Sequence, residues 1–100
     1  MKAYVGTDRN GTKLYESDIC SYTITYPENG VTNQYKGMIV YDSSEYAFMF
    51  EQTNDDFPLV FMNAVNIDSI EKVMSIEDME STYPEYNMWC EIYKSNFGAK

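Results

Sequence analysis

The stretch Ile19-Cys20-Ser21-Tyr22-Thr23-Ile24-Thr25-Tyr26 decides the fold class of this chain. From Cys20 onward, larger side chains alternate with hydroxyl-bearing ones, and β-branched and aromatic residues are frequent. Successive side chains of a β-strand point to opposite faces, so this alternation predicts a strand that buries one face. One face carries Cys20, Tyr22, Ile24 and Tyr26, and the other carries Ser21, Thr23 and Thr25.

Two short extended runs precede this strand. Residues Met1 to Val5 and Thr12 to Glu16 flank the pair Asn10-Gly11, and both residues of that pair tolerate the positive φ of a type I′ turn. We therefore expect an N-terminal β-hairpin with this turn. Asp18, at the entry to the next strand, is expected to accept hydrogen bonds from backbone amides.

Two further strands are expected after the turn Pro27-Glu28-Asn29-Gly30. They run from Val31 to Tyr41 and from Tyr46 to Gln52, and a polar loop joins them. Gly37 lies inside the first run, where glycine favours a bulge or a sharp bend, as at the corner of a small barrel.

The next segments are less regular. Leu59-Val60-Phe61-Met62 is a short apolar run whose length favours a strand buried on both faces over a helix. Residues 66–76 fit a helix and a strand equally well. Helical spacing joins Ile67, Ile70, Val73 and Met74, whereas strand alternation joins Ile70, Met74 and Ile76.

The C-terminal segment from Pro84 to Phe97 is predicted to be a helix. Glu85 suits the positive end of the helix dipole, Lys94 suits the negative end, and Gly98 is a natural stop. The apolar face recurs at helical spacing and comprises Tyr86, Trp89, Cys90, Tyr93 and Phe97.

The predicted fold is therefore a single domain over residues 1–100 of the mainly β (α+β) class. We expect a small bent antiparallel sheet or an SH3-like barrel with a C-terminal helix. The β core would span about residues 1–76, and a C-terminal helical extension would span about residues 77–100.

Two blocks of the sequence resemble a known family. The first is Tyr4-Val5-Gly6 leading to Asn10-Gly11 and then Leu14-Tyr15-Glu16-Ser17-Asp18-Ile19-Cys20; the second is Gly37-Met38-Ile39-Val40-Tyr41-Asp42 followed by Ala47-Phe48. Both are similar to YopX-like phage proteins over about residues 4–50. Ser17 stands where that family usually has glycine. The resemblance implies a small bent β-barrel-like domain of phage or prophage origin, and it carries over no catalytic residue.

The charge of the chain is concentrated in residues 37–93. This stretch has one base, Lys72, and twelve acids, a net charge of 1 − 12 = −11, whereas the whole chain has −9. The acids are Asp42, Glu45, Glu51, Asp55, Asp56, Asp68, Glu71, Glu77, Asp78, Glu80, Glu85 and Glu91. Such a field repels nucleic acid and attracts basic surfaces.

The sequence offers little catalytic chemistry. It has no histidine, so triads with a histidine base and histidine-bearing zinc sites are excluded. Asn54-Asp55-Asp56 has no ligand spacing typical of an EF-hand, and we expect a solvated loop there. We therefore predict a protein that is not an enzyme and has no cofactor and no metal. Adjacent carboxylates such as Asp55/Asp56 or Glu77/Asp78 could serve acid–base catalysis, and a structure that placed two of these four in one shared pocket would revive the enzyme hypothesis.

No run of about 20 apolar residues is present, and no apolar segment follows Lys2 as in a signal peptide. We expect a cytoplasmic protein, in the host bacterial cytoplasm, with no membrane partner. Cys20 and Cys90 are then expected to be reduced thiols.

The function predicted from charge and resemblance is inhibition by mimicry. The acidic surface would bind a basic host protein that handles nucleic acid, such as a nuclease or an RNA-guided effector, as DNA mimics and anti-CRISPR proteins do, without direct contact with nucleic acid. The partner-binding residues would be Asp42, Glu45, Asp55, Asp56, Glu77, Asp78, Glu80, Glu85 and Glu91.

Two other readings remain open. The acidity alone is also typical of a protein whose negative charge serves only to keep it soluble. The chain also fits a YopX-like structural or accessory module, which forms a homo-oligomer or docks on a phage or host protein through tyrosine and phenylalanine surfaces.

Overall fold

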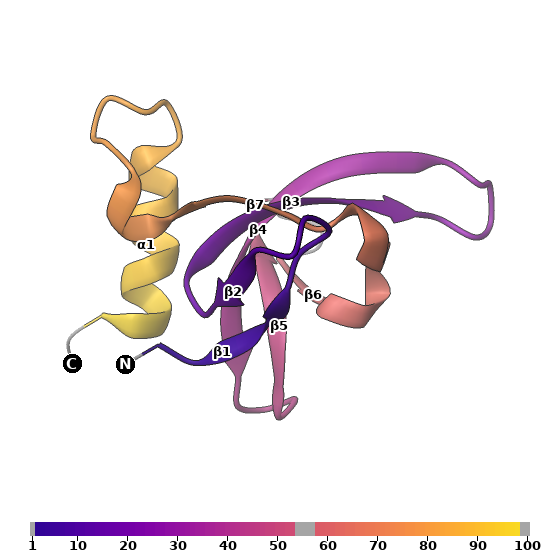
Figure 1. The fold of residues 1–100 in the computed structure, drawn as a ribbon, viewed down its shortest axis with the longest axis horizontal. Helices are drawn as coiled ribbons and strands as arrows, with labels where there is room; N and C mark the ends of the chain where they lie inside the picture. The colour runs from indigo at the N-terminus through magenta and orange to yellow at the C-terminus, as the bar shows by residue number, and fades with distance from the viewer. Residues whose placement is uncertain (1, 54–57, 99–100) are drawn as a thin grey trace.

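A computed structural model describes residues 2–53 and 58–98 of the chain. Figure 1 shows a curved antiparallel sheet with a helix on one side and a small N-terminal hairpin against it. The elements are β1 (Tyr4–Thr7), β2 (Lys13–Tyr15), β3 (Asp18–Thr25), β4 (Thr32–Asp42), β5 (Ala47–Gln52), β6 (Leu59–Phe61), β7 (Glu71–Ser75) and α1 (Tyr86–Phe97), with the 3₁₀ turns η1 (Met62–Ala64), η2 (Ile67–Ser69) and η3 (Ile76–Asp78).

Five strands form one open sheet in the order β6-β5-β4-β3-β7, and β1 and β2 form a separate two-stranded sheet. All pairs are antiparallel. The predicted mainly β fold with a C-terminal helix is therefore confirmed. The barrel alternative is not found, because β6 and β7 lie at opposite edges and the described residues form no closed barrel.

The predicted strand from Ile19 to Tyr26 is β3, the strand between β4 and β7. It pairs with β4 from Ile19 to Thr25 and with β7 from Asp18 to Ser21. Its side chains contribute to both cores of the molecule, because Ile19 lies in one core and Cys20 and Tyr22 lie in the other.

The N-terminal hairpin forms, but with a different turn from the predicted one. Only Gly11 of the pair Asn10-Gly11 has a positive φ, +80°. The N–H of Asp8 donates to the carbonyl oxygen of Thr12, and the N–H of Gly11 donates to that of Asp8. This is a longer loop in which a turn is followed by a left-handed glycine, so the type I′ assignment was wrong.

Gly37 does not form the predicted bulge. The register of β4 is continuous on both sides, with Gly37 opposite Cys20 and Gln52. A Cβ at this position would lie 2.5 Å from the Tyr22 hydroxyl and 2.8 Å from the Cβ of Phe50. The glycine therefore makes room for the Tyr22 ring, and the irregularity of the sheet lies between Ile19 and Cys20 where β3 meets β7.

The structure also tests the predictions for Leu59–Phe61 and for residues 66–76. Leu59–Phe61 is an edge strand with Leu59 38% and Phe61 41% exposed, so the prediction of a strand buried on both faces was wrong. In residues 66–76 the strand alternative is found as β7, which the three-residue 3₁₀ turn η2 precedes, and the helix alternative, which joined Ile67 to Met74, is not found.

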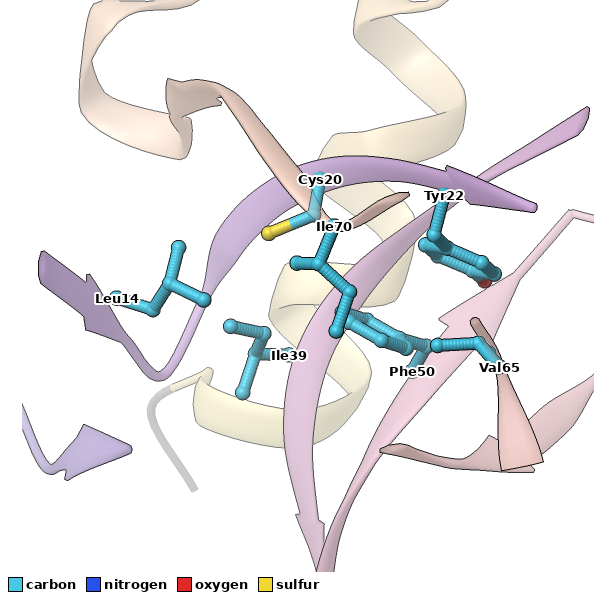
Figure 2. Packing of buried hydrophobic residues seen from close by; sticks show 7 residues of the cluster. All are labelled: Leu14, Cys20, Tyr22, Ile39, Phe50, Val65 and Ile70. Atoms are coloured by element: carbon cyan, nitrogen blue, oxygen red, sulfur yellow. The ribbon is translucent and has the colours of Figure 1, made fainter. Parts of the chain in front are cut away.

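One face of the sheet packs against the N-terminal hairpin and the η1–η2 segment. Tyr22 stacks on Phe50 with ring centroids 4.3 Å apart, and its hydroxyl donates to Oε1 of Gln52 at 2.5 Å. Burial raises the pKa of this hydroxyl, so it remains a donor. Figure 2 shows the side chains of this hairpin-side core, which are Leu14, Cys20, Tyr22, Ile39, Phe50, Val65 and Ile70.

The other face packs against α1. Its buried side chains, the helix-side core, are Ile19, Met38, Val40, Met79 and Trp89. Tyr86, Tyr93 and Phe97 of the predicted helical face pack against them. The helix begins at Tyr86 rather than at Pro84, because the chain before it is held in turns in which the N–H of Tyr83 donates to the oxygen of Glu80 and that of Tyr86 to the oxygen of Tyr83.

The contact between Gly37 and Tyr22 leads to a first prediction. We expect Gly37→Ala to lower the free energy of unfolding by about 2 kcal/mol, because the added methyl group overpacks the core. In a Tyr22→Phe background, which lacks the hydroxyl, the same change should cost roughly 1 kcal/mol less. Urea denaturation of the four proteins measures this coupling, and an equal cost in both backgrounds would contradict the assigned role of Gly37.

Candidate functional site

Asp8, in the near-neutral first third of the chain, is buried and fully bonded. Its Oδ1 accepts hydrogen bonds from the N–H groups of Asn10 and Thr12, both at 2.9 Å. Its Oδ2 accepts from the backbone N–H of Lys72 at 2.9 Å. The Lys72 bond is the main reason that the pKa of Asp8 lies below its ordinary value. This carboxylate joins the N-terminal hairpin to β7.

Asp18 is the second buried acid, with 1% of its surface exposed. Its Oδ2 accepts from the N–H of Tyr15 at 2.9 Å, which confirms that Asp18 binds a backbone amide at the strand entry. The same oxygen lies 3.3 Å from Nζ of Lys72. Asp8 and Asp18 therefore contact the backbone and the side chain of one lysine, and both have a structural role that sequence charge alone did not distinguish.

Cys20 lies beside this charged cluster and is also buried. Burial chiefly, and the charges of Asp18 and Asp8 next, raise the pKa of its thiol to about 12. The thiol is therefore protonated near neutral pH and is a poor nucleophile. Both Cys20 and the half-buried Cys90 are free thiols.

The acids predicted to bind a partner are at the surface wherever the structure describes them. Asp55 and Asp56 lie outside the described residues. Asp42 and Glu85 are half-buried. The exposed ones are Glu45, Glu77, Asp78, Glu80 and Glu91.

Three of the exposed acids follow one another on η3 and the turn after it. Asp78 and Glu80 line a depression of about 240 Å³ together with Met74 and Tyr83. Glu77 forms an ion pair with Lys2, which lowers its pKa. Because η3 packs beside α1, these acids lie on the helix side of the sheet.

A second pair of acids lies where α1 passes over β5. Glu91 and Glu51 line a shallow groove of about 390 Å³, with Met88, Ile92 and Pro58 among its walls. Oε1 of Glu51 accepts a hydrogen bond from Nδ2 of Asn96 at 2.9 Å. Glu51 was not among the predicted partner-binding residues, and its contact with α1 arises only in the folded chain.

Glu85, the residue before α1, is partly neutralised by a lysine. Its Oε1 lies 3.4 Å from Nζ of Lys36, which also donates to the Tyr83 hydroxyl at 3.3 Å. The Tyr83 bond, and then the charge of Glu85, raise the pKa of Lys36. This contact fixes the start of α1 against β4.

The remaining two predicted acids, Asp42 and Glu45, lie elsewhere. Asp42 ends β4 and Glu45 lies in the loop between β4 and β5, and Figure 1 shows this loop well apart from α1. Asp42 accepts hydrogen bonds from the N–H and hydroxyl of Ser44, and these bonds lower its pKa. The predicted acids are therefore divided between two separate parts of the molecule.

We call the larger group the acidic helix side. With the bases Lys2, Lys36 and Lys94 on the same side, its net charge is 3 − 6 = −3. It consists of Glu51, Glu77, Asp78, Glu80, Glu85 and Glu91.

Among residues 2–53 and 58–98, no three acidic, cysteine or histidine side chains gather closely enough to hold a metal ion. No helix in this part of the chain is long and apolar enough to cross a membrane.

A scan against protein-family models finds no match, and searches of curated proteins and of solved structures find none. The resemblance of residues 4–50 to YopX-like proteins stays a prediction.

The buried ion pair leads to a second prediction. We expect Lys72→Met to lower the free energy of unfolding by about 3 kcal/mol, because it leaves the buried Asp18 carboxylate without its counter-charge. The matched change Lys2→Met removes an exposed ion pair and should cost less than about 1 kcal/mol. Chemical denaturation compares the two, and equal losses would show that Asp18 and Lys72 do not hold β7 in place.

The two thiols lead to a third prediction. In the native protein at pH 8, a thiol reagent should modify Cys90 and leave Cys20 unmodified, because burial and a raised pKa suppress the Cys20 thiolate. Mass spectrometry of the modified protein locates the label, and labelling in denaturant should reach both thiols. Fast native labelling of Cys20 would contradict its burial.

Proposed function

We propose that this chain is a non-enzymatic binding protein whose acidic helix side recognises a basic partner protein. One observation carries the proposal: the acids that hold the fold together are the buried Asp8 and Asp18, whereas those on η3 and α1 are largely exposed. Exposed like charges repel one another and oppose folding slightly, so a partner that neutralises them gains free energy on binding.

The sign and the spacing of these charges indicate the kind of partner. Opposite charges steer association and act over about 8 Å at physiological ionic strength. A protein that binds the phosphates of DNA or RNA has a groove lined with lysine and arginine, and carboxylates spaced along η3 and α1 suit such a groove. A nuclease or an RNA-guided effector is the partner we favour, and binding there would inhibit it by excluding nucleic acid. The resemblance to a phage family supports an anti-defence role.

A structural or accessory module is the second candidate, and exposed aromatic side chains favour it. Tyr46 is 84% exposed and has a φ of +54° at the end of the β4–β5 loop, and Tyr4 and Tyr41 are about half exposed. Aromatic residues of this kind anchor protein interfaces. Such an interface would be much less sensitive to salt than an acidic one.

A charge-matched comparison tests the first candidate. We expect Glu77→Gln, Asp78→Asn and Glu80→Gln together to weaken the captured partner's binding by roughly tenfold or more, because exposed charges set long-range attraction. The matched control changes three exposed acids away from the helix side, Glu28→Gln, Glu45→Gln and Asp68→Asn. It should lose less than about threefold in affinity.

The partner is first captured from a bacterial lysate at low salt and identified by mass spectrometry, and affinities are then measured with the purified pair. Binding should weaken steeply as salt rises and should compete with DNA or RNA for the partner. If both triple variants bind equally, or if affinity does not depend on salt, the acidic helix side is not the binding surface.

A further inference from the structure

One part of the sheet has a neighbour on only one side. β4 pairs with β3 from Thr32 to Met38, but with β5 only from Gly37 to Asp42. The outer halves of β3 and β4 therefore form a two-stranded arm, which Figure 1 shows reaching away from the rest of the molecule. Beside it, a depression of about 380 Å³ extends from Gln34 to Thr53 and Glu85.

The direction of the backbone groups in this arm follows from the hydrogen bonds at its two ends. On the β3 side, the N–H of Ser17 donates to the oxygen of Ile39, and the N–H of Tyr26 donates to the oxygen of Val31. Alternate residues of an antiparallel strand point their N–H and C=O groups to the same side. The backbone N–H and C=O groups of the odd-numbered residues of β4 therefore point towards β3. Those of Thr32 and Gln34 point towards the open edge.

The opposite edge of the arm is covered. The oxygen of Thr23 accepts the N–H of Asn66 at 2.9 Å, and its N–H donates to Oγ of Ser69 at 2.8 Å. The side-chain amide of Asn66 also donates to the hydroxyl groups of Thr23 and Thr25. Proteins usually block exposed strand edges in this manner, and among the described residues no such cover lies on the β4 edge.

We propose that this β4 edge pairs with the same edge of a second copy of the chain, so that two sheets join into one. The occupant follows from charge. The whole chain has a net charge of −9, which makes two copies repel, but residues 19–36 have one acid, Glu28, and one base, Lys36. The arm is thus neutral, and the edge residues Thr32, Asn33 and Gln34 are uncharged.

The register of this pairing is limited by β5. Gln52 already occupies the position beside Gly37, so the second copy cannot extend past Lys36. A register centred on Asn33 places Thr32 opposite Gln34 of the second copy and Gln34 opposite its Thr32. In both pairs the N–H of each residue donates to the C=O of the residue opposite. Every backbone group that Thr32 and Gln34 present to the edge is then hydrogen-bonded.

This geometry has a consequence for the acidic surface. Antiparallel edges of two identical sheets are related by a two-fold axis perpendicular to the sheet, so both copies of α1 lie on the same face. The dimer would present two acidic helix sides together. Because these repel, the dimer should become tighter as salt rises, the opposite of binding to a basic partner.

Analytical ultracentrifugation of the full chain tests the proposal. We expect a monomer–dimer equilibrium with a dissociation constant on the order of 100 µM, since the interface is small. Gln34→Pro removes one outward N–H without breaking the pairing with β3, and it should weaken the dimer by roughly tenfold or more. Gln34→Thr changes the same side chain but keeps the N–H, and it should dimerise like the unmodified chain.

Hydrogen exchange keeps the test independent of whether Gln34→Pro folds. In the unmodified chain, the amides of Thr32 and Gln34 should become protected as concentration rises, whereas those of Asn33 and Tyr35 are protected throughout. A monomer at all concentrations up to about 1 mM would overturn the proposal. A dimer in which the Thr32 and Gln34 amides exchange freely would overturn it as well.

Discussion

Lys72 holds the parts of this fold together. Its backbone N–H binds the carboxylate of Asp8, and its ammonium group lies against that of Asp18, so one residue connects the N-terminal hairpin, β3 and β7. β7 is also where the chain passes from the hairpin side of the sheet to the helix side, because η3 and α1 follow it. The position of the exposed acids on η3 and α1 therefore depends on two buried acids and a lysine. A buried ion pair contributes little net stability, but removal of one partner leaves the other charge buried and unpaired, which is costly. The pair therefore favours this arrangement of β3 and β7 over others.

The acids of this protein have two different physical roles. Asp8 and Asp18 are buried and accept hydrogen bonds from backbone N–H groups, so the fold needs their charge. Glu77, Asp78 and Glu80 lie on η3 and the turn after it, where all three are exposed and Glu77 forms a surface ion pair with Lys2. Net charge alone could not separate these roles, because the buried acids occur in the part of the sequence whose charges balance. The separation supports the proposal that the helix side is available to a basic partner.

Much of the fold could be predicted because its strands alternate clearly. The alternation from Cys20 to Tyr26 predicts that Tyr22 lies on the buried face of its strand. It also predicts that its neighbours Ser21 and Thr23 lie on the opposite face. Errors arose where the outcome depended on a residue of another strand. Gly37 looked like a bulge because the Tyr22 ring that needs its space lies on β3. The apolar run at Leu59 looked buried because its place at the edge of the sheet is a property of topology.

The candidate site was predictable only in composition. The exposure of Glu45, Glu80 and Glu91 follows from their charge, but their grouping depends on where α1 and the β4–β5 loop lie. Glu51 joins the helix side because Asn96 of α1 reaches it, a contact between residues 45 positions apart. Local periodicity contains no information on such a distance.

We expect that the fold does not need the acids it exposes on the helix side. The most direct measurement is the free energy of unfolding of a variant in which Glu77, Asp78, Glu80 and Glu91 are all neutralised, compared with Asp18→Ala. We expect the four-acid variant to stay within about 1 kcal/mol of the unmodified chain, or to gain stability at low salt. Asp18→Ala should lose about 3 kcal/mol. A loss in the four-acid variant as large as that of Asp18→Ala would contradict the claim.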